Sequence, residues 1–496
     1  GPFATPPASG LRKAGQKIGF SRPGGPSKVL RSLDEALEAS GLRDGMTISF
    51  HHGLRNGDRV MNMVMQAIAR KGIKGLTLAP SSFLDSNDEL VPLFESGVIV
   101  AAQTSGLRSK LGRYLTMNKL SKTTILRPHG GRARALECGE LHVDVTFLAA
   151  PTCDALGNVN GTQGPAACGS LGYAMMDARY ADMVVAITDH LADHPICPVS
   201  IPQHQVDYVA VVDSIGDPKG IATGALRGVR NPRDLIIAQM AASVIEHAGY
   251  FKEGFAMQLG AGAISVATGS LLRDMMLRDR ITASMGIGGV VGPFCDLLDE
   301  GLIRTLFDTQ SFDDRTIQSL RDNPKHQEYD VGFYANPWNK ATMVNSLDYV
   351  VLGATEMDVH FNVNVLTDSN GIMMGAVGGH PDAAAGAKCA IITAPLLRGR
   401  LPMVTDAVQT ICTPGEVVDV VVTDRGVAVN PARADLLDRL KNSGLPLKTM
   451  EELRDLACEL AGCKPEALEF SDNVTSVVEY RDGTALDVVR SPVQKQ

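Results

Sequence analysis

Long apolar runs are missing from this chain: no stretch approaches about 18 apolar residues, so neither a membrane-spanning helix nor a membrane partner is expected. Long runs of lysine and arginine are missing too, and the formal net charge is −8. Because binding to phosphate backbones needs clustered basic side chains, nucleic acid is not an expected partner. None of the nine cysteines stands in a C-x-x-C spacing. An odd number of scattered cysteines without a signal peptide predicts reduced thiols in a cytoplasmic protein.

The common nucleophile and nucleotide motifs are also missing, since neither G-x-S-x-G nor a P-loop occurs. Two glycine-rich segments approach the dinucleotide fingerprint G-x-G-x-x-G, and each lacks its third glycine. In "LGAGAISVATG" that position is Ser265, and in "MGIGGVVG" it is Val291. A nicotinamide cofactor is therefore not expected, and a plain strand-to-helix turn is the alternative interpretation.

The sequence gives only a weak signal for a metal site. His190 and His194 stand four residues apart, which would place both on one helix face, but Pro195 ends such a helix and no third ligand has matching spacing. We expect no metal in this chain.

The chain does have many glycines, fifty in 496 residues, which favours an α/β protein with short loops. Short apolar strands alternate with amphipathic helices from residue 46 onward, as in "MTISF", "GLTLAP" and "VIVAAQTS". The alternation restarts at "FAMQLGAGAIS" after a turn-rich stretch near Gly228. We therefore predict a disordered or tag-derived segment over 1–27, one α/β domain over 28–228 and a second over 229–496.

Basic and hydroxyl side chains follow two of the predicted strands. His51, His52 and Arg55 come directly after "MTISF", and Ser105 and Arg108 come after "VIVAAQT". Ligands of open α/β sheets bind at the carboxyl ends of the strands, and arginine can hold a carboxylate with two hydrogen bonds. The sequence predicts a binding site for an anion at this edge, with solvated loop charges as the alternative.

A third glycine-rich segment, "NGIMMGAVGGHPDAAAGAKC", contains Gly378 and Gly379. Consecutive N–H groups without side chains can bind an anion or stabilise a developing oxyanion. Upstream, "TEMDVHFNVN" alternates polar residues, so that Asn362 and Asn364 are expected on one face of a strand as part of a site wall. The residues alone predict a two-domain α/β enzyme for a small anionic substrate, with a glycine-rich oxyanion site.

Several long motifs resemble one protein family, the α subunit of bacterial citrate lyase, which is its citrate CoA-transferase component. The resemblance runs from about residue 32 to 489. The motifs that carry it are "MTISFHHGLRNGDRVMNMVMQAIARKGIKGLTLAPSS", "TSGLRSKLG", "GGRARALECGELHVDVTFLAAPTCDALGNVNG", "GYFKEGFAMQLGAGAIS", "FNVNVLTDSNGIMMGAVGGHPDAAAGAK", "APLLRGRLPMV" and "VTDRGVAVNPAR".

The resemblance implies two Rossmann-like halves of the acyl-CoA transferase type, facing each other across a cleft. It implies exchange of acetate for citrate on a thioester, with acetyl-CoA or the dephospho-CoA-derived prosthetic group of an acyl carrier subunit as the thioester. It further implies an oligomer with the acyl carrier (gamma) subunit and the citryl lyase (beta) subunit. The alternatives are a CoA transferase or thioester hydrolase for another short acid, and a non-catalytic scaffold subunit.

The segment "TASMGIGGVVGPFCDLLDEG" (282–301) departs from the wider superfamily. Matching it to related CoA-transferases places their nucleophilic glutamate opposite Gly288, where this chain has no carboxylate. The resemblance therefore favours direct attack of a citrate carboxylate on the acetyl thioester, through a mixed citric–acetic anhydride. Gly378 and Gly379 would then stabilise the oxyanion, and the citrate site would include the anion-binding residues named above. The expected contacts to the thioester arm are Gln258, Gly260, Gly262, Gly288 and Gly289.

Overall fold

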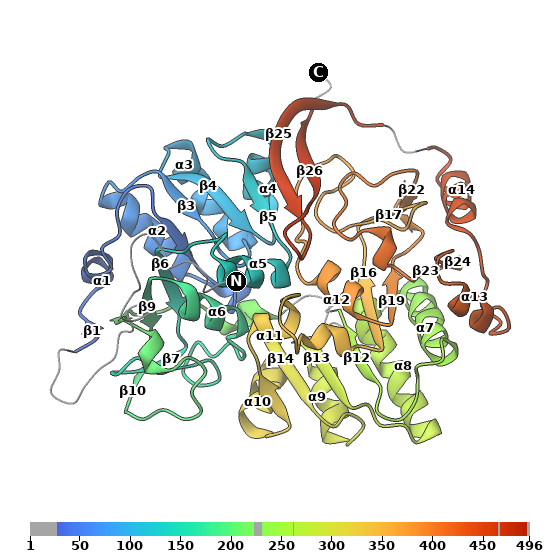
Figure 1. The fold of residues 1–496 in the computed structure, drawn as a ribbon, viewed down its shortest axis with the longest axis horizontal. Helices are drawn as coiled ribbons and strands as arrows, with labels where there is room; N and C mark the ends of the chain where they lie inside the picture. Colours follow the sequence, from blue (N-terminus) through green and yellow to red (C-terminus); the bar gives the residue numbers. More distant parts are fainter. Residues whose placement is uncertain (1–26, 223–230, 261, 465–466, 494–496) are drawn as a thin grey trace, which may run out of the picture.

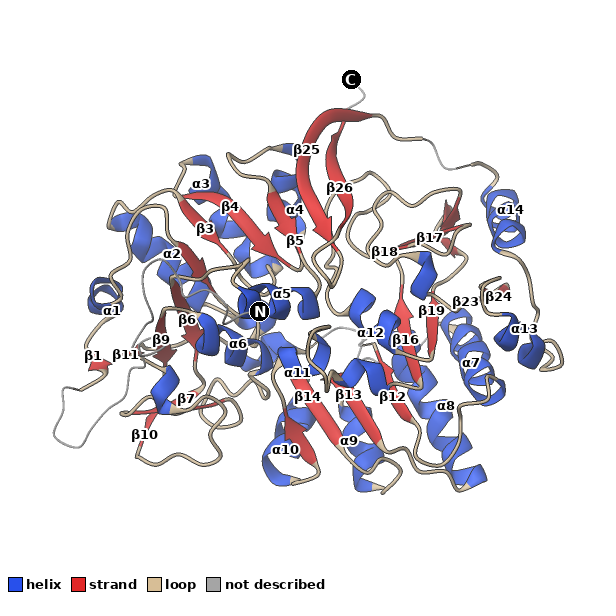
Figure 2. Ribbon diagram, in the orientation of Figure 1, coloured by secondary structure: helices blue, strands red, loops and turns tan. Residues whose placement is uncertain are grey.

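The computed structural model describes residues 27–222, 231–260, 262–464 and 467–493, and shows two α/β halves side by side (Figure 1). Each half is built on one large sheet whose strands are mostly parallel, with helices packed against it (Figure 2). The predicted fold class of two open α/β domains is confirmed. Nearly all of segment 1–27 and the boundary near Gly228 lie outside the described residues.

The N-terminal half contains a ten-stranded sheet in the order β1-β11-β9-β6-β2-β3-β4-β5-β25-β26. Its strands are β1 (Val29–Leu30), β2 (Thr47–Ser49), β3 (Leu76–Leu78), β4 (Ile99–Thr104), β5 (Thr124–Leu126), β6 (Val145–Ala149), β9 (Met183–Thr188), β11 (Tyr208–Val211), β25 (Phe470–Glu479) and β26 (Ala485–Pro492). Its helices are α1 (Leu33–Ala39), α2 (Val60–Arg70), α3 (Val91–Glu95), α4 (Ser109–Met117), α5 (His129–Cys138) and α6 (Gly172–Tyr180). A small sheet orders β10 (Leu191–Ala192), β7 (Thr152–Asp154) and β8 (Val159–Asn160).

The C-terminal half contains an eight-stranded sheet in the order β15-β14-β13-β12-β16-β19-β23-β24. Its strands are β12 (Ala256–Leu259), β13 (Met285–Val290), β14 (Leu306–Ser311), β15 (His326–Glu328), β16 (Tyr349–Gly353), β19 (Cys389–Thr393), β23 (Val420–Thr423) and β24 (Gly426–Val429). The smaller strands are β17 (Glu356–Asp358), β18 (Val363–Asn364), β20 (Leu397–Arg398), β21 (Leu401–Pro402) and β22 (Val404–Thr405). The helices are α7 (Pro232–His247), α8 (Ala263–Asp279), α9 (Gly292–Asp299), α10 (Asp314–Asp322), α11 (Val331–Ala335), α12 (His380–Gly386), α13 (Ala434–Leu440) and α14 (Met450–Ala461).

Local sequence explains where many helices begin and which face they bury. Ser32 caps α1, because its hydroxyl accepts a hydrogen bond from the N–H of Glu35. Helix α2 buries the apolar side chains that recur at helical spacing, including Val60, Val64 and Ile68, which are all at most 1% exposed. In the second half, α8 packs against both α7 and α9, while α11 packs on α5 and α6 of the first half.

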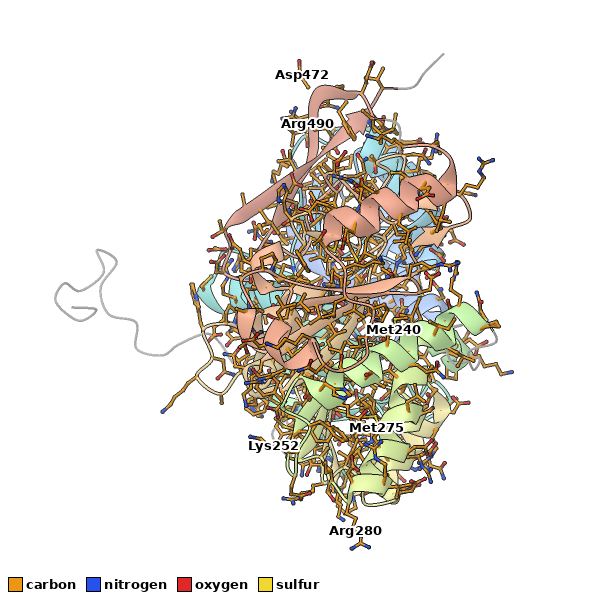
Figure 3. All side chains as sticks on the ribbon, turned by 90° about the vertical axis from the view of Figure 1, so that its right-hand side faces the viewer. Met240, Lys252, Met275, Arg280, Asp472 and Arg490 are labelled. Atoms are coloured by element: carbon orange, nitrogen blue, oxygen red, sulfur yellow. The ribbon has the colours of Figure 1, made fainter. Side chains whose placement is uncertain are left out.

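The last two strands lie within the predicted C-terminal domain, 229–496, but do not join its sheet. The hairpin β25–β26 leaves the second half and extends the first sheet, where β25 runs parallel to β5. Figure 3 places its residues Asp472 and Arg490 at the opposite end of the molecule from Arg280, which follows α8. Asp482 and Gly483 form the hairpin turn between β25 and β26, and Gly483 has φ +93.

Two segments differ from the local structure that the sequence suggests. His190 and His194 do not share a helix, because β10 is extended there, and their rings contact Thr152 and Asp154 instead. The segment "TEMDVHFNVN" is not one strand, because the chain reverses after β17 and β18 returns antiparallel to it. The side chain of Asn364 therefore donates to Glu356 and Thr367 within the fold.

No helix in the described ranges combines the length and the apolar character that crossing a bilayer requires.

Candidate active site

A cavity of about 310 Å³ lies between the two halves, where the carboxyl ends of strands from both sheets meet. Loops after β2, β3 and β4 supply one wall, and the ends of β12, β13 and β14 supply the opposite wall. The predicted residues that line it are His52, Arg55, Ser105, Arg108, Gln258, Gly260, Gly289, Gly378 and Gly379. Distant segments of the sequence thus converge on one site, as expected for open α/β sheets.

Arg55 and Arg108 give the cavity its positive charge. Burial, with a smaller contribution from the charge of Arg108, lowers the pKa of Arg55 to about 10. Burial also lowers the pKa of Arg108, and the charge of Asp85 partly offsets that effect. Neither guanidinium pairs directly with a carboxylate in the described part of the chain. Two charged guanidiniums that are not directly paired with a carboxylate favour binding of a polyvalent anion.

The loops that carry these arginines hold unusual backbone conformations. Arg55 itself has φ +51, and Ser109, directly after Arg108, has φ +54. Residues other than glycine rarely adopt this left-handed region, and such strain concentrates at ligand-binding sites. The guanidinium carbon of Arg55 also lies 5.0 Å from the ring centroid of Phe312, so the second half helps to hold it.

Histidines in and behind the cavity are held in the neutral form. Burial lowers the pKa of His129 to about 3 and that of His380 to about 4. His52 is shifted in the same direction, and its Nδ1 lies 2.6 Å from the hydroxyl of Ser81. At neutral pH these rings are therefore polar hydrogen-bonding groups without charge.

The cavity wall contains no aspartate or glutamate among the described residues. A covalent mechanism through an enzyme carboxylate would need one within reach of the substrate. The structure also shows the surroundings of Gly288, the position at which the sequence lacks a carboxylate. Gly288 has φ +102, and a Cβ added there would lie 2.9 Å from Cδ of Gln258. The amide of Gln258 is held in that place by the hydroxyl of Tyr334, which lies 2.9 Å from its Nε2.

Gly288 was expected to contact the thioester arm, but it does not line the cavity. The side chain of Gln258 fills the space beside it, and the absence of a Cβ at Gly288 leaves room for that side chain. At the next residue, β13 shifts register against β14, and Gly289 reaches the cavity wall.

The glycine-rich loop before α12 contributes Gly378 and Gly379 to the cavity wall. Neither the N–H of Gly378 nor that of Gly379 has a hydrogen-bond acceptor among the described residues. The loop is attached to the first half, because Val377 donates to the carbonyl of Ser105 and His129 donates to that of Gly378. Gly378 adopts φ +58. Unpaired N–H groups on residues that line a cavity are candidate donors to an oxyanion.

Five predicted site residues do not line the cavity. Gly262 and Gly288 lie outside it, and the ring of His51, which burial keeps neutral with a pKa of about 4, is buried behind it. Asn362 donates to Asp358 and accepts from the N–H of Gly415, which leaves its amide engaged within the fold, as is that of Asn364. We do not include the two asparagines in the site.

Other lining residues were missed. His129 follows β5 just as His52 follows β2, so its position after a strand in "TILRPHGG" was a usable signal. Tyr173 and Tyr334 come from helices α6 and α11, and nothing in their local sequence marks them. Further lining side chains that the sequence did not indicate are Ser82, Thr309, Gln310, Phe312 and His380.

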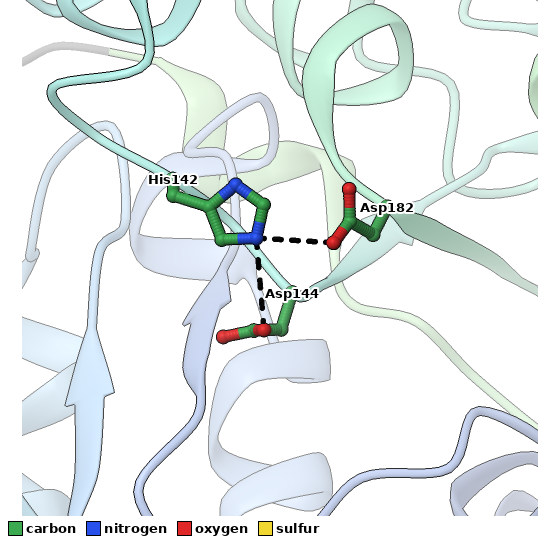
Figure 4. A group of neighbouring side chains, drawn as sticks. All are labelled: His142, Asp144 and Asp182. Atoms are coloured by element: carbon green, nitrogen blue, oxygen red, sulfur yellow. Dashed lines mark ion pairs between the residues drawn. The ribbon is translucent and has the colours of Figure 1, made fainter. Parts of the chain in front are cut away.

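One group in the described part of the chain has side chains close enough to hold a metal ion (Figure 4). His142 Nε2 lies 3.0 Å from Asp182 Oδ2 and 3.7 Å from Asp144 Oδ1. These residues precede β6 and β9, at the amino ends of the strands and thus at the edge of the sheet opposite the cavity. The side chains of His142 and Asp182 are more than half exposed, and the contacts are those of a surface ion pair.

A buried carboxyl group joins the two halves and makes stability depend on pH. Burial raises the pKa of Glu328 to about 7, although the N–H of Leu171 and the hydroxyl of Ser200 both donate to it. Because the folded-state pKa lies above the unfolded one, its contribution to stability is full below the unfolded value. That contribution is lost as pH rises through about 7.

Glu328→Gln should therefore gain stability relative to the parent protein as pH rises from about 5 to about 8. Thermal unfolding of both proteins across this range gives the difference in Tm at each pH. Exposed Glu459 provides the matched substitution Glu459→Gln, for which the difference should stay flat. A difference for Glu328→Gln that is also flat would contradict the raised pKa.

The comparisons with known proteins agree with one another. A family model described as citrate lyase, alpha subunit, matches residues 26–492. The citrate lyase alpha chain of Klebsiella pneumoniae is 50% identical over 463 residues, covering 93% of this chain and 91% of the relative. That of Escherichia coli strain K12 is 48% identical over 462 residues, covering 93% and 90%.

Solved structures show the same relationship. A crystal structure from Streptococcus mutans, described as an alpha subunit of citrate lyase in complex with citrate, matches with a TM-score of 0.93 and 46% identity, covering 98% of this chain and 96% of that one. The alpha subunit of a malonate decarboxylase from Acinetobacter baumannii matches with a TM-score of 0.65 and 14% identity, covering 88% and 90%. The second similarity concerns the fold alone.

Proposed function

The chain belongs to the citrate lyase alpha subunit family, whose members carry a transferase activity, and on this premise we propose that it exchanges acetate for citrate on a CoA-type thioester. The observation that supports this most directly is the composition of the cavity wall. Arg55 and Arg108 provide positive charge for the carboxylates of citrate, and no enzyme carboxylate competes for them among the described lining residues.

The proposed reaction proceeds by direct attack. A citrate carboxylate oxygen attacks the acetyl carbonyl carbon, and the N–H groups of Gly378 and Gly379 donate to the oxyanion that forms. The C–S bond then breaks, which yields a mixed citric–acetic anhydride and a thiolate. The thiolate attacks the citryl carbonyl, and the C–O bond to the bridging oxygen breaks to release acetate. No net proton transfer is required, which is consistent with neutral His52 and His129.

Alignment of the two substrates is the main contribution of the protein in this scheme. Arg55 and Arg108 hold the citrate carboxylates, and the neutral rings of His52 and His129 add hydrogen bonds at the same wall. Gln258 and Gly260 lie where the thioester would enter from the second half. The thioester is acetyl-CoA or the dephospho-CoA-derived arm of an acyl carrier subunit, and it acts as a substrate.

We further propose that the chain works in an oligomer with the acyl carrier (gamma) subunit and the citryl lyase (beta) subunit. The family assignment supports this arrangement. A cytoplasmic location stays a prediction of the sequence.

A single-turnover experiment with ¹⁸O in the citrate carboxylates tests direct attack. In that mechanism the bridging oxygen of the anhydride comes from citrate, so acetate should carry ¹⁸O in the first turnover. With an enzyme acyl anhydride, the first acetate would instead take its oxygen from the protein. Mass spectrometry of acetate distinguishes the two, and unlabelled first-turnover acetate would rule out the direct route.

The substrate is tested separately by assaying acetyl-CoA with citrate, succinate and butyrate. Exchange with citrate at least ten times faster than with the others is the expected outcome. Faster reaction with another acid, or hydrolysis without exchange, would point to a different transferase or a thioesterase. A chain without activity on any of them, in the complex as well as alone, would indicate a scaffold.

A further inference from the structure

A second cavity, of about 230 Å³, lies between α8 and α9 and adjoins the first. Leu259 and Gly260, at the end of β12, line both cavities. The two cavities are thus adjacent at the end of β12, where Gly260 carries no side chain. We call the second cavity the α8–α9 groove.

The groove is lined mainly by apolar and small side chains. Val266 on α8 faces it together with Phe294 and Leu297 on α9. Between them, α8 contributes Gly269 and Ser270, and a Cβ on Gly269 would lie 3.0 Å from Leu259 Cδ1. The groove is therefore narrow beside α8, and the small residues Gly269 and Ser270 keep it open.

The outer end of the groove is marked by charge. Arg273 on α8 pairs with Glu300, which follows α9, at 2.7 Å, and both side chains are about 40% exposed. From the first residue of α8 to Arg273 the helix advances ten residues, or about 15 Å. The groove thus runs from the rim of the active-site cavity to the molecular surface.

We propose that the α8–α9 groove binds the pantetheine-type arm of the thioester substrate. The inference rests on the proposed function, because it assumes that a thioester reacts in the first cavity. A thioester carbon placed beside Gly378 requires the rest of the arm to leave the cavity, and the shared wall at Gly260 provides an exit. A thin chain of methylene groups and amides fits a narrow, mostly apolar groove. The outer end of the groove, where Arg273, Asp296 and Glu300 stand, is where the part of the CoA-type group beyond pantetheine would emerge.

The test compares two thioesters that differ only in the arm. Acetyl-pantetheine has the whole arm, whereas S-acetyl-N-acetylcysteamine keeps the thioester end and lacks the rest. Ser270→Trp should fill the groove, and Leu277→Trp adds the same bulk at an exposed position seven residues further along α8, beyond Arg273. In the Ser270 variant, the ratio of kcat/KM for acetyl-pantetheine to that for the short thioester should fall at least tenfold, whereas the Leu277 variant should keep the parent ratio.

Two outcomes would overturn the groove assignment. One is an unchanged ratio in the Ser270 variant, and the other is an equal loss on both thioesters, which would indicate general damage. Ser270→Leu, a smaller obstruction, repeats the comparison if the tryptophan variant does not fold. Failure of the proposed function would look different, since the parent protein itself would then exchange acetate for citrate on neither thioester.

Discussion

Replacing Arg108 by methionine is expected to lower kcat/KM for citrate by about 100-fold, corresponding to about 3 kcal/mol. Methionine keeps much of the apolar stem and removes the guanidinium, so a citrate carboxylate would be buried without its partner. Arg108→Lys keeps the charge and loses the two parallel hydrogen bonds, and a loss of about tenfold is expected. Steady-state kinetics with citrate as the varied substrate give both values.

The control for this prediction lies on the helix that follows. Arg113 is exposed on α4, and Arg113→Met should leave kcat/KM within about twofold of the parent protein. The thioester KM should change little in the Arg108 variants, because the guanidinium is assigned to citrate. Parent-like citrate kinetics in Arg108→Met would remove this residue from the site.

The second large effect is expected at Gly379, where the backbone N–H is the functional group. Proline at this position removes the N–H, and alanine adds a Cβ while keeping it. Either Cβ would lie 2.9 Å from the hydroxyl of Tyr334, so the variants share that contact, and proline further adds the ring atoms that replace the N–H hydrogen. Loss of one oxyanion donor typically lowers kcat by about 10²–10³-fold. We expect kcat of Gly379→Pro to fall by that factor relative to Gly379→Ala.

Comparing the two variants tests the hydrogen bond beyond the Cβ contact that both share. The φ of Gly379 is −93, which is near the range that proline adopts, so the backbone need not move far. Circular dichroism and Tm confirm that both variants fold. Equal kcat values in the two would show that this N–H does not stabilise the transition state, whatever the shared Cβ does to the parent activity.

The part of the site that was predictable from sequence is the part set by local order along the chain. His52, Arg55, Ser105 and Arg108 each follow an apolar strand within a few residues. Parallel strands bring their carboxyl ends to one edge, so position after a strand was enough to group them. The same reasoning applies to His129, which follows β5.

Predictions failed where a side chain's partner is set by how the chain folds back on itself and by which strands become neighbours. Alternation suggested a strand face with Asn362 and Asn364, but a chain reversal turns their amides onto Asp358 and Glu356. The meaning of Gly288 likewise depended on Gln258, thirty residues earlier, whose position is held by Tyr334. Periodicity cannot show such contacts, because they depend on how strands are ordered in the sheet.

The sequence by itself determined the α/β alternation, the absence of a nucleophilic carboxylate near Gly288, and the family, because these are properties of local order and of residue identity. Only the tertiary structure decided that the C-terminal hairpin joins the first sheet and that Tyr173 and Tyr334 face the cavity. It also decided that Arg55 and Arg108 share one cavity without a carboxylate partner among the described residues. The physical reason is that the charge and burial of a side chain are set by its neighbours in space, and the two halves supply those neighbours from opposite ends of the chain.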